Sequence, residues 1–169
     1  MAASLLGDAF AHHIWATLQV MDACDALTPE QLGADAPGTF GPILDTMRHL
    51  VGADSWYLHR LSGGDHAPIE EDEMNLADLR AAMERHAAAW PEVLAADPDP
   101  EEFIEVSQDD GSVYRATKGI RLAQVLHHGT DHRSQICTAL TSLGVEPPKI
   151  GVWEYGDTVG RTEQVAATS

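Results

Sequence analysis

Two histidines late in the chain, His128 and His132, have the spacing of a metal-binding pair. Apolar residues recur around them at helical intervals, and residues four apart on a helix share one face with Cβ atoms roughly 5–6 Å apart. Two imidazoles placed in this way can bind one ion of zinc, nickel, copper, iron or manganese. The competing interpretation is a pair of buried histidines whose ring nitrogens bond to the backbone or to water.

A second pair, His127 and Asp131, has the same spacing in the adjacent register. It points about 100° away from the apolar stripe of the expected helix. We therefore interpret it as a solvated ion pair, and we place the metal-binding face on the side of His128 and His132.

A third ligand would have to come from a facing helix. His49 is the best candidate because it lies in the middle of another apolar helical stretch, at the edge of its stripe. His12 and His13 are alternatives. Three neutral imidazoles leave coordination positions open, which is typical of reactive sites rather than structural ones. An ion held in this way can lower the pKa of bound water towards ~7 or activate a thiolate.

Outer partners of the site can also be named. Ligand imidazoles usually donate their second N–H to a carboxylate or a carbonyl. Asp54 lies on an apolar stripe, where a carboxylate needs a partner, and it is one candidate together with Arg133 and His13. A structural salt bridge between Asp54 and Arg133 explains those two residues equally well.

The remaining histidines and the cysteines are interpreted more simply. Three histidines have no partner at metal-ligand spacing, and we expect them to be solvated. The two cysteines are too few for a disulfide framework, and we expect each to be a small buried apolar residue. These residues are His59, His66, His86, Cys24 and Cys137.

Four stretches carry apolar residues at three- and four-residue intervals, and each predicts an amphipathic helix. The long connection between the third and fourth stretches contains two β-prone runs around an Asp-Gly pair, which predict a short hairpin. The expected fold class is all-α, a four-helix bundle with a β-hairpin between its third and fourth helices. The four stretches are residues 4–27, 41–61, 75–94 and 118–143.

Composition limits the possible partners. The chain has 169 residues, with 27 acidic against 10 basic side chains and a formal charge of −17, which argues against nucleic acid as a ligand. The first twenty residues lack the basic start of a secretory signal, and no apolar run has the length of a membrane helix. We expect a cytoplasmic protein with one domain over residues 1–157 and a flexible tail over residues 158–169.

Three segments together resemble a known family. They are APGTFGPILDTMRHL at residues 36–50, followed by Trp56; HGTDHRSQI at residues 128–136; and LGVEPP at residues 143–148. Over about residues 5–157 the chain resembles the DinB-like (damage-inducible) superfamily of metal-dependent enzymes.

The resemblance implies a four-helix bundle, often dimeric, in which three histidines hold a divalent metal. Carried over by position, these are His49, His128 and His132. Relatives include transferases and isomerases that depend on low-molecular-weight thiols. Our leading hypothesis is therefore a metal-dependent transferase that joins such a thiol to an electrophilic small molecule in detoxification or stress. The alternatives are a hydrolase that uses metal-bound hydroxide, and a non-catalytic metal-binding protein of the stress response.

Overall fold

The computed structural model describes residues 4–165, which are mostly helical with one small antiparallel sheet. The predicted helices and hairpin are all present, with boundaries within a few residues of those expected. The elements are α1 (Leu5–Cys24), α2 (Pro29–Leu32), α3 (Ile43–Leu61), the 3-10 turn η1 (Glu71–Glu73), α4 (Leu76–Ala95), β1 (Phe103–Ser107), β2 (Val113–Thr117), α5 (Lys118–Ser142) and α6 (Val152–Thr158).

Side-chain caps explain where several helices begin. The Ser4 hydroxyl accepts a hydrogen bond from the first turn of α1, and Thr117 does the same for α5. Asn75 and Asp78 form a reciprocal capping box at the start of α4. Each cap satisfies backbone N–H groups that have no partner within the helix. The start of α5 matters most for function, because it sets the register of the helix that carries His128 and His132.

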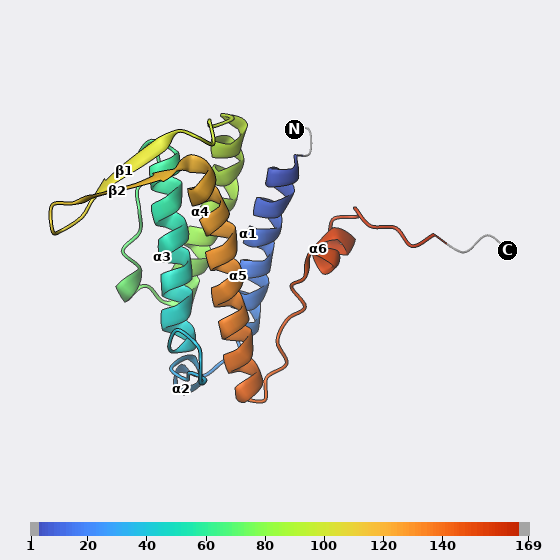
Figure 1. Cartoon of the computed structure of the whole chain (residues 1–169). Helices are drawn as coiled ribbons and strands as arrows, with labels where there is room; N and C mark the ends of the chain where they lie inside the picture. The colour runs from blue at the N-terminus through green and yellow to red at the C-terminus, as the bar shows by residue number, and fades with distance from the viewer. Residues whose placement is uncertain (1–3, 166–169) are drawn as a thin grey trace.

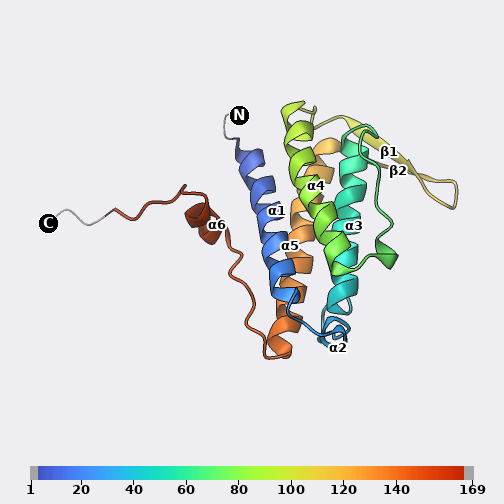
Figure 2. The ribbon, with the colours of Figure 1, turned by 180° about the vertical axis from the view of Figure 1, so that it is seen from behind.

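The four long helices α1, α3, α4 and α5 lie side by side, as Figures 1 and 2 show from opposite sides. Contacts join α3 to both α4 and α5, and α1 to both α4 and α5. Each long helix therefore packs against two others. This arrangement places the middle of α3 beside the middle of α5.

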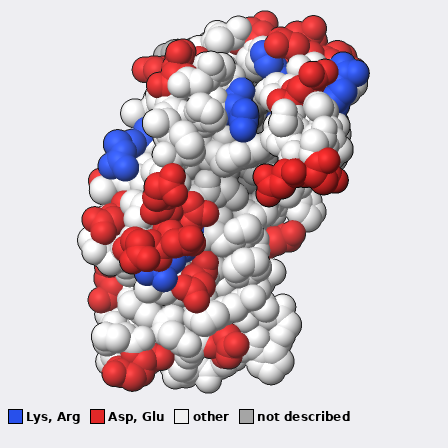
Figure 3. Space-filling model, turned by 90° about the vertical axis from the view of Figure 1, so that its left-hand side faces the viewer, with Lys and Arg blue, Asp and Glu red and all other residues white. Residues whose placement is uncertain are grey.

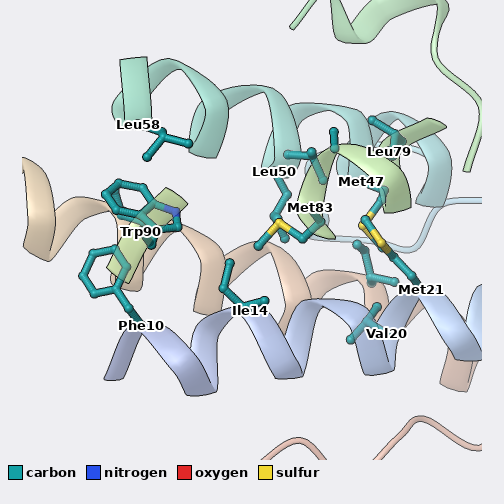
Figure 4. Packing of buried hydrophobic residues seen from close by; sticks show 14 of the residues in the cluster. Phe10, Ile14, Val20, Met21, Met47, Leu50, Leu58, Leu79, Met83 and Trp90 are labelled. Carbon is teal, nitrogen blue, oxygen red and sulfur yellow. The ribbon is translucent and has the colours of Figure 1, made fainter. Parts of the chain in front are cut away.

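Buried apolar side chains from the long helices fill the space between them, and Figure 4 shows this packing from close by. Phe10 of α1 packs on Trp90 of α4 with ring centroids 4.6 Å apart. Met47 of α3 and Met83 of α4 are fully buried. Close packing of this kind holds the helix backbones in fixed relative positions, so polar side chains at their edges are also positioned.

The hairpin and the C-terminal segment lie outside the group of long helices (Figure 1). Strands β1 and β2 pair antiparallel, with Phe103 opposite Thr117, and β2 leads directly into α5. The segment after α5 returns along α1, where the Tyr155 ring of α6 lies 5.5 Å from that of Trp15. Of the tail expected over residues 158–169, residues 166–169 lie outside the described residues. Among the described helices, none has the length and apolar character needed to cross a membrane.

Candidate metal centre

Three histidines from two helices meet between α3 and α5. His49 comes from α3, and His128 and His132 come from successive turns of α5. One ring nitrogen of each lies within 4.8 Å of the other two, so the group could hold a metal ion. The Nε2 atoms of His128 and His49 face each other at 3.1 Å. The tertiary structure therefore brings His49 to the α5 pair, and neither His12 nor His13 joins it.

The distance between the His128 and His49 nitrogens fits ligation of one divalent ion. Two nitrogens that bind the same ion at about 2.1 Å lie roughly 3.0 Å apart at an octahedral right angle and about 3.4 Å apart at the tetrahedral angle. The 3.1 Å between His128 and His49 falls between these values. The His128 and His132 rings are also close, with centroids 4.3 Å apart.

Gln135 sets the tautomer of His132. Its Oε1 atom lies 3.1 Å from His132 Nδ1 and also accepts a hydrogen bond of 2.9 Å from the Phe40 backbone N–H. A carbonyl oxygen can only accept, so His132 carries its proton on Nδ1 and its Nε2 lone pair is free. This is the form in which imidazole binds metals, and the amide oxygen acts as its outer partner.

The Phe40 ring covers one side of the histidine group. It stacks on His49 with ring centroids 4.4 Å apart and planes within 7°, and it meets His132 edge-on at 5.3 Å. Sequence reasoning did not assign a role to Phe40 or Gln135. The signal was present, because each residue lies inside one of the three segments that carry the family resemblance. It could not be used, because neither type of side chain is a metal ligand by itself.

The imidazoles of His128 and His132 favour the neutral form. Burial lowers the pKa of His128 to about 4, and the neighbouring His132 and His49 act in the same direction. Burial likewise lowers the pKa of His132, although its hydrogen bond with Gln135 acts in the opposite direction. Metal ligation requires unprotonated imidazole nitrogen, so these environments prepare the ligands at neutral pH.

A cavity of about 410 Å³ opens beside His49 and His128. Trp56, Tyr57 and Glu71 also line it. Glu71 comes from η1, and its carboxylate lies where a Cβ at Gly52 would be. Gly52 is one turn after His49 on α3, so the absence of a side chain there lets η1 approach the helix. The cavity thus has aromatic walls and one carboxylate next to the histidines.

A second polar group is buried close by, with one or more members from each long helix. Asp54 of α3 accepts hydrogen bonds from His13 Nε2 at 3.0 Å and from Trp90 Nε1 at 3.1 Å. His86 Nδ1 of α4 lies 2.7 Å from the same carboxylate, a close contact that is poorly aligned for a hydrogen bond. Arg133 of α5 donates to His13 Nδ1 at 2.9 Å. We refer to these five residues as the Asp54 cluster.

The Asp54 carboxylate is stabilised in its charged form. Burial alone would raise its pKa, but the polar contacts and charges that His13 and His86 provide outweigh burial, and the pKa is lowered from its ordinary value. Gly129 helps to bring the cluster together, because a Cβ at that position would overlap the His13 ring. The α1 and α5 backbones can therefore approach closely, one residue away from His128.

These contacts correct several expectations. His13 bonds to both Asp54 and Arg133, whereas the outer partner of His132 is Gln135. His13 lies between Asp54 and Arg133, so the alternative of a direct salt bridge between those two residues is replaced by contacts through the His13 imidazole. The prediction that His86 is solvated is wrong, since only 5% of it is exposed. Periodicity missed this because His86 and Asp54 lie on different helices, and pairing across helices supplies the polar partner.

Other residues behave as the sequence indicated or differ only slightly. His127 and Asp131 form the expected exposed ion pair, at 3.1 Å. Cys24 is buried, while Cys137 is only partly buried. His59 and His66, expected to be solvated, are half-buried, and the His59 ring bonds to the backbone carbonyl of His66.

The protein is mostly helical, and three imidazoles converge between two of its long helices. These features place it in the class of candidate metal-binding helical proteins. Comparison with protein families matches residues 1–163 to the DinB family. The chain belongs to this family. No curated protein matches the chain.

Proposed function

We propose that this protein binds one divalent metal ion through His49, His128 and His132 and uses it to join a low-molecular-weight thiol to an electrophilic small molecule. The observation that best supports the proposal is the convergence of three imidazoles beside a cavity, with His132 in the tautomer that a metal ligand needs. Zinc, nickel, iron and manganese all accept imidazole ligands, so the donor set is compatible with each of them.

We also infer that the four long helices form a four-helix bundle. Each packs against two others, and the candidate ligands come from two facing helices. Metal sites of helical bundles are commonly built in this way, from inward-pointing side chains on facing helices.

A divalent ion at this position would lower the pKa of a coordinated thiol or water, which supplies a nucleophile at neutral pH. The chain's own residues would orient and shield the reaction. Gln135 holds the His132 ring, and Phe40 stacks on His49 and excludes water from that side. Trp56 and Tyr57 offer aromatic walls for an electrophile with an apolar part.

The protein's own thiols are poor nucleophiles, which favours a thiol from outside. Burial raises the pKa of Cys24 to about 12, and burial also raises the pKa of Cys137. The thiolate is the reactive form, so both side chains are almost entirely unreactive at neutral pH. Neither cysteine lines the cavity beside the histidines.

The test has two parts, both made on the purified full chain. Elemental analysis is expected to find about one divalent ion per chain, since the histidine group offers one site. The loaded protein is then incubated with a panel of small thiols and a generic electrophile, and product formation is compared with that of the free metal ion. No metal in the wild-type protein, or no rate above free metal with any thiol, would reject the proposed transferase.

Two other outcomes identify the alternatives. Turnover of model esters or amides without any thiol would point to hydrolysis. Stoichiometric metal without turnover in either assay would point to a metal-binding protein of the stress response.

A homodimer and a cytoplasmic location also remain proposals, drawn from the family resemblance and the sequence. Light scattering on the eluting protein is expected to give twice the mass of one chain. The mass of a single chain would reject the dimer without affecting the metal site.

A further inference from the structure

The cleft beside the histidines continues along α3 and α5 towards the hairpin. Trp56 is seven residues after His49 on α3, and Arg121 is seven residues before His128 on α5. Residues seven apart lie on nearly the same face of a helix and about 10 Å apart along its axis. A second cavity, of about 590 Å³, lies there and shares the walls Trp56 and Tyr57 with the cavity of the histidines.

Arg121 is buried in the wall of this second cavity, and one of its hydrogen-bond donors has no acceptor. Only 4% of the residue is exposed. Its Nη2 donates to the Ile104 carbonyl of β1 at 3.2 Å, but its buried Nε has no acceptor among residues 4–165. A buried guanidinium N–H without an acceptor is unfavourable, and such a group in a folded protein calls for an explanation such as a bound ligand or ion.

Arg60 of α3 lies in the same cavity and has the same deficit. Its Nε is also buried without an acceptor in the described part of the chain. The two guanidinium groups lie 5.2 Å and 5.4 Å from the centroid of the Trp56 ring, so both are held against one aromatic side chain. Stacking on an aromatic ring is a preferred setting for arginine.

Neither arginine has an acidic partner within residues 4–165, although the chain carries 27 acidic residues. Asp109 is an acidic residue of the same cavity wall, but it is exposed and forms no ion pair with Arg60 or Arg121. Figure 3 shows acidic side chains widely spread over the hairpin side of the molecule. Two unpaired guanidinium groups in one cavity of such an acidic protein point to an anion from outside.

We propose that Arg60 and Arg121 bind an oxyanion, a carboxylate or a phosphate, carried by the small molecule whose reactive end lies at His49 and His128. The second half of this statement rests on the proposed function, whereas the anion site does not. Guanidinium groups bind both types of oxyanion with paired, charge-assisted hydrogen bonds. The ligand has its anionic group on the order of 10 Å from its reacting atom, as the helical spacing requires.

The anion site can be tested on the metal-free full chain, because it lies outside the histidine group. Titration calorimetry with succinate and, separately, with inorganic phosphate compares wild-type protein with Arg60→Gln. Arg85→Gln is the matched control, since it removes one positive charge from an exposed position on α4. Arg60→Gln is expected to bind the favoured anion roughly tenfold more weakly or worse, as loss of a hydrogen bond to a charged group implies.

The outcomes separate the two anions and the two arginines. Binding of succinate alone identifies a carboxylate site, and binding of phosphate alone a phosphate site. Binding of neither anion, or equal binding by Arg60→Gln and Arg85→Gln, overturns the proposal. Arg121→Lys provides a second variant, with folding checked by circular dichroism. It keeps the charge but loses the paired donors, so weaker anion binding with an intact helix signal is expected.

The link to the histidines is tested with metal-loaded protein. Glutathione, a thiol with two carboxylates, is compared with its diethyl ester, in which both are masked. Wild-type protein is expected to bind glutathione at least roughly tenfold more tightly than the ester, and Arg60→Gln to lose this preference. Equal binding of the two overturns the link. Absence of metal in wild-type protein instead rejects the proposed function. The anion site is then judged only by the titration of metal-free protein.

Discussion

The protein contains two histidine clusters within a few residues of each other, and they are built in opposite ways. His49, His128 and His132 have no carboxylate among them, and two of them, His49 and His128, border a cavity. His13 and His86 lie on either side of Asp54, and all three are buried. The first cluster lacks a negative partner for a cation, and the second already contains one.

Comparison of the two clusters shows what decides the role of a buried histidine. In the Asp54 cluster the carboxylate and Arg133 occupy both ring nitrogens of His13, so that no lone pair remains for a metal. At the other cluster burial favours the neutral rings of His128 and His132, and Gln135 directs the free lone pair of His132 towards its neighbours. The partner on the outer nitrogen, rather than the imidazole itself, separates a structural histidine from a candidate ligand.

The largest expected effect is the loss of metal from His128→Ala. Loss of an outer partner weakens metal binding by about 10–100-fold, so loss of a ligand is expected to exceed ~100-fold. Elemental analysis after dialysis measures the metal that each variant retains. His127→Ala is the matched control, because it removes the adjacent, exposed imidazole. Equal metal content in the two variants would contradict the assignment of the ligand face.

Asp54→Asn should affect folding and leave the metal ligands in place. Removal of one charged partner from a buried group of this kind costs about 3–5 kcal/mol, because the donors around it lose their acceptor charge. Urea unfolding of metal-free protein measures the change, with exposed Asp131→Asn expected to stay within about 0.5 kcal/mol of wild type. If Asp54→Asn instead lost metal with unchanged stability, the two clusters would have been assigned the wrong way round.

Gln135→Leu should weaken metal binding without abolishing it. The substitution frees the His132 tautomer and leaves the Phe40 N–H without its acceptor, and a loss of about 10–100-fold in metal affinity is expected. Competition with a chromophoric chelator gives the affinity. Gln124→Leu, at an exposed position of the same helix, is expected to match wild type. A wild-type affinity in Gln135→Leu would show that the tautomer is set in another way.

The smallest effects should appear in the pH dependence of metal-free protein. The folded-state pKa of His128 is lowered from 6.5 to about 4, so the unfolded chain binds more protons between these values and stability falls as pH falls through them. Asp54, also with a lowered pKa, contributes stability that is lost only below its ordinary value of 3.8. Urea unfolding across this range should show a flatter curve for His128→Ala between pH 6.5 and 4. An unchanged curve there would contradict the burial of His128 in its neutral form.

Sequence reasoning reached much of the fold because the relevant signals are local. Apolar periodicity located the four long helices, and caps such as Asn75 lie where their ends were expected. The spacing of His128 and His132 set the face of α5 that carries the candidate ligands. The prediction from sequence was wrong for His86. Its partner Asp54 lies on another helix, and the neighbours of His86 in the chain reveal nothing about that contact.

The sequence by itself determined the helices, the α5 histidine pair and, through the family resemblance, the identity of His49 as its partner. Gln135 meets His132 within one helix, but only the tertiary structure decided which oxygen His13 meets. Helix packing brings Asp54 of α3 to His13 of α1, and Arg121 of α5 to the Trp56 ring of α3. The physical reason is that helical periodicity indicates which side of a helix faces inward, whereas the charge of a buried group such as Asp54 depends on side chains from other helices.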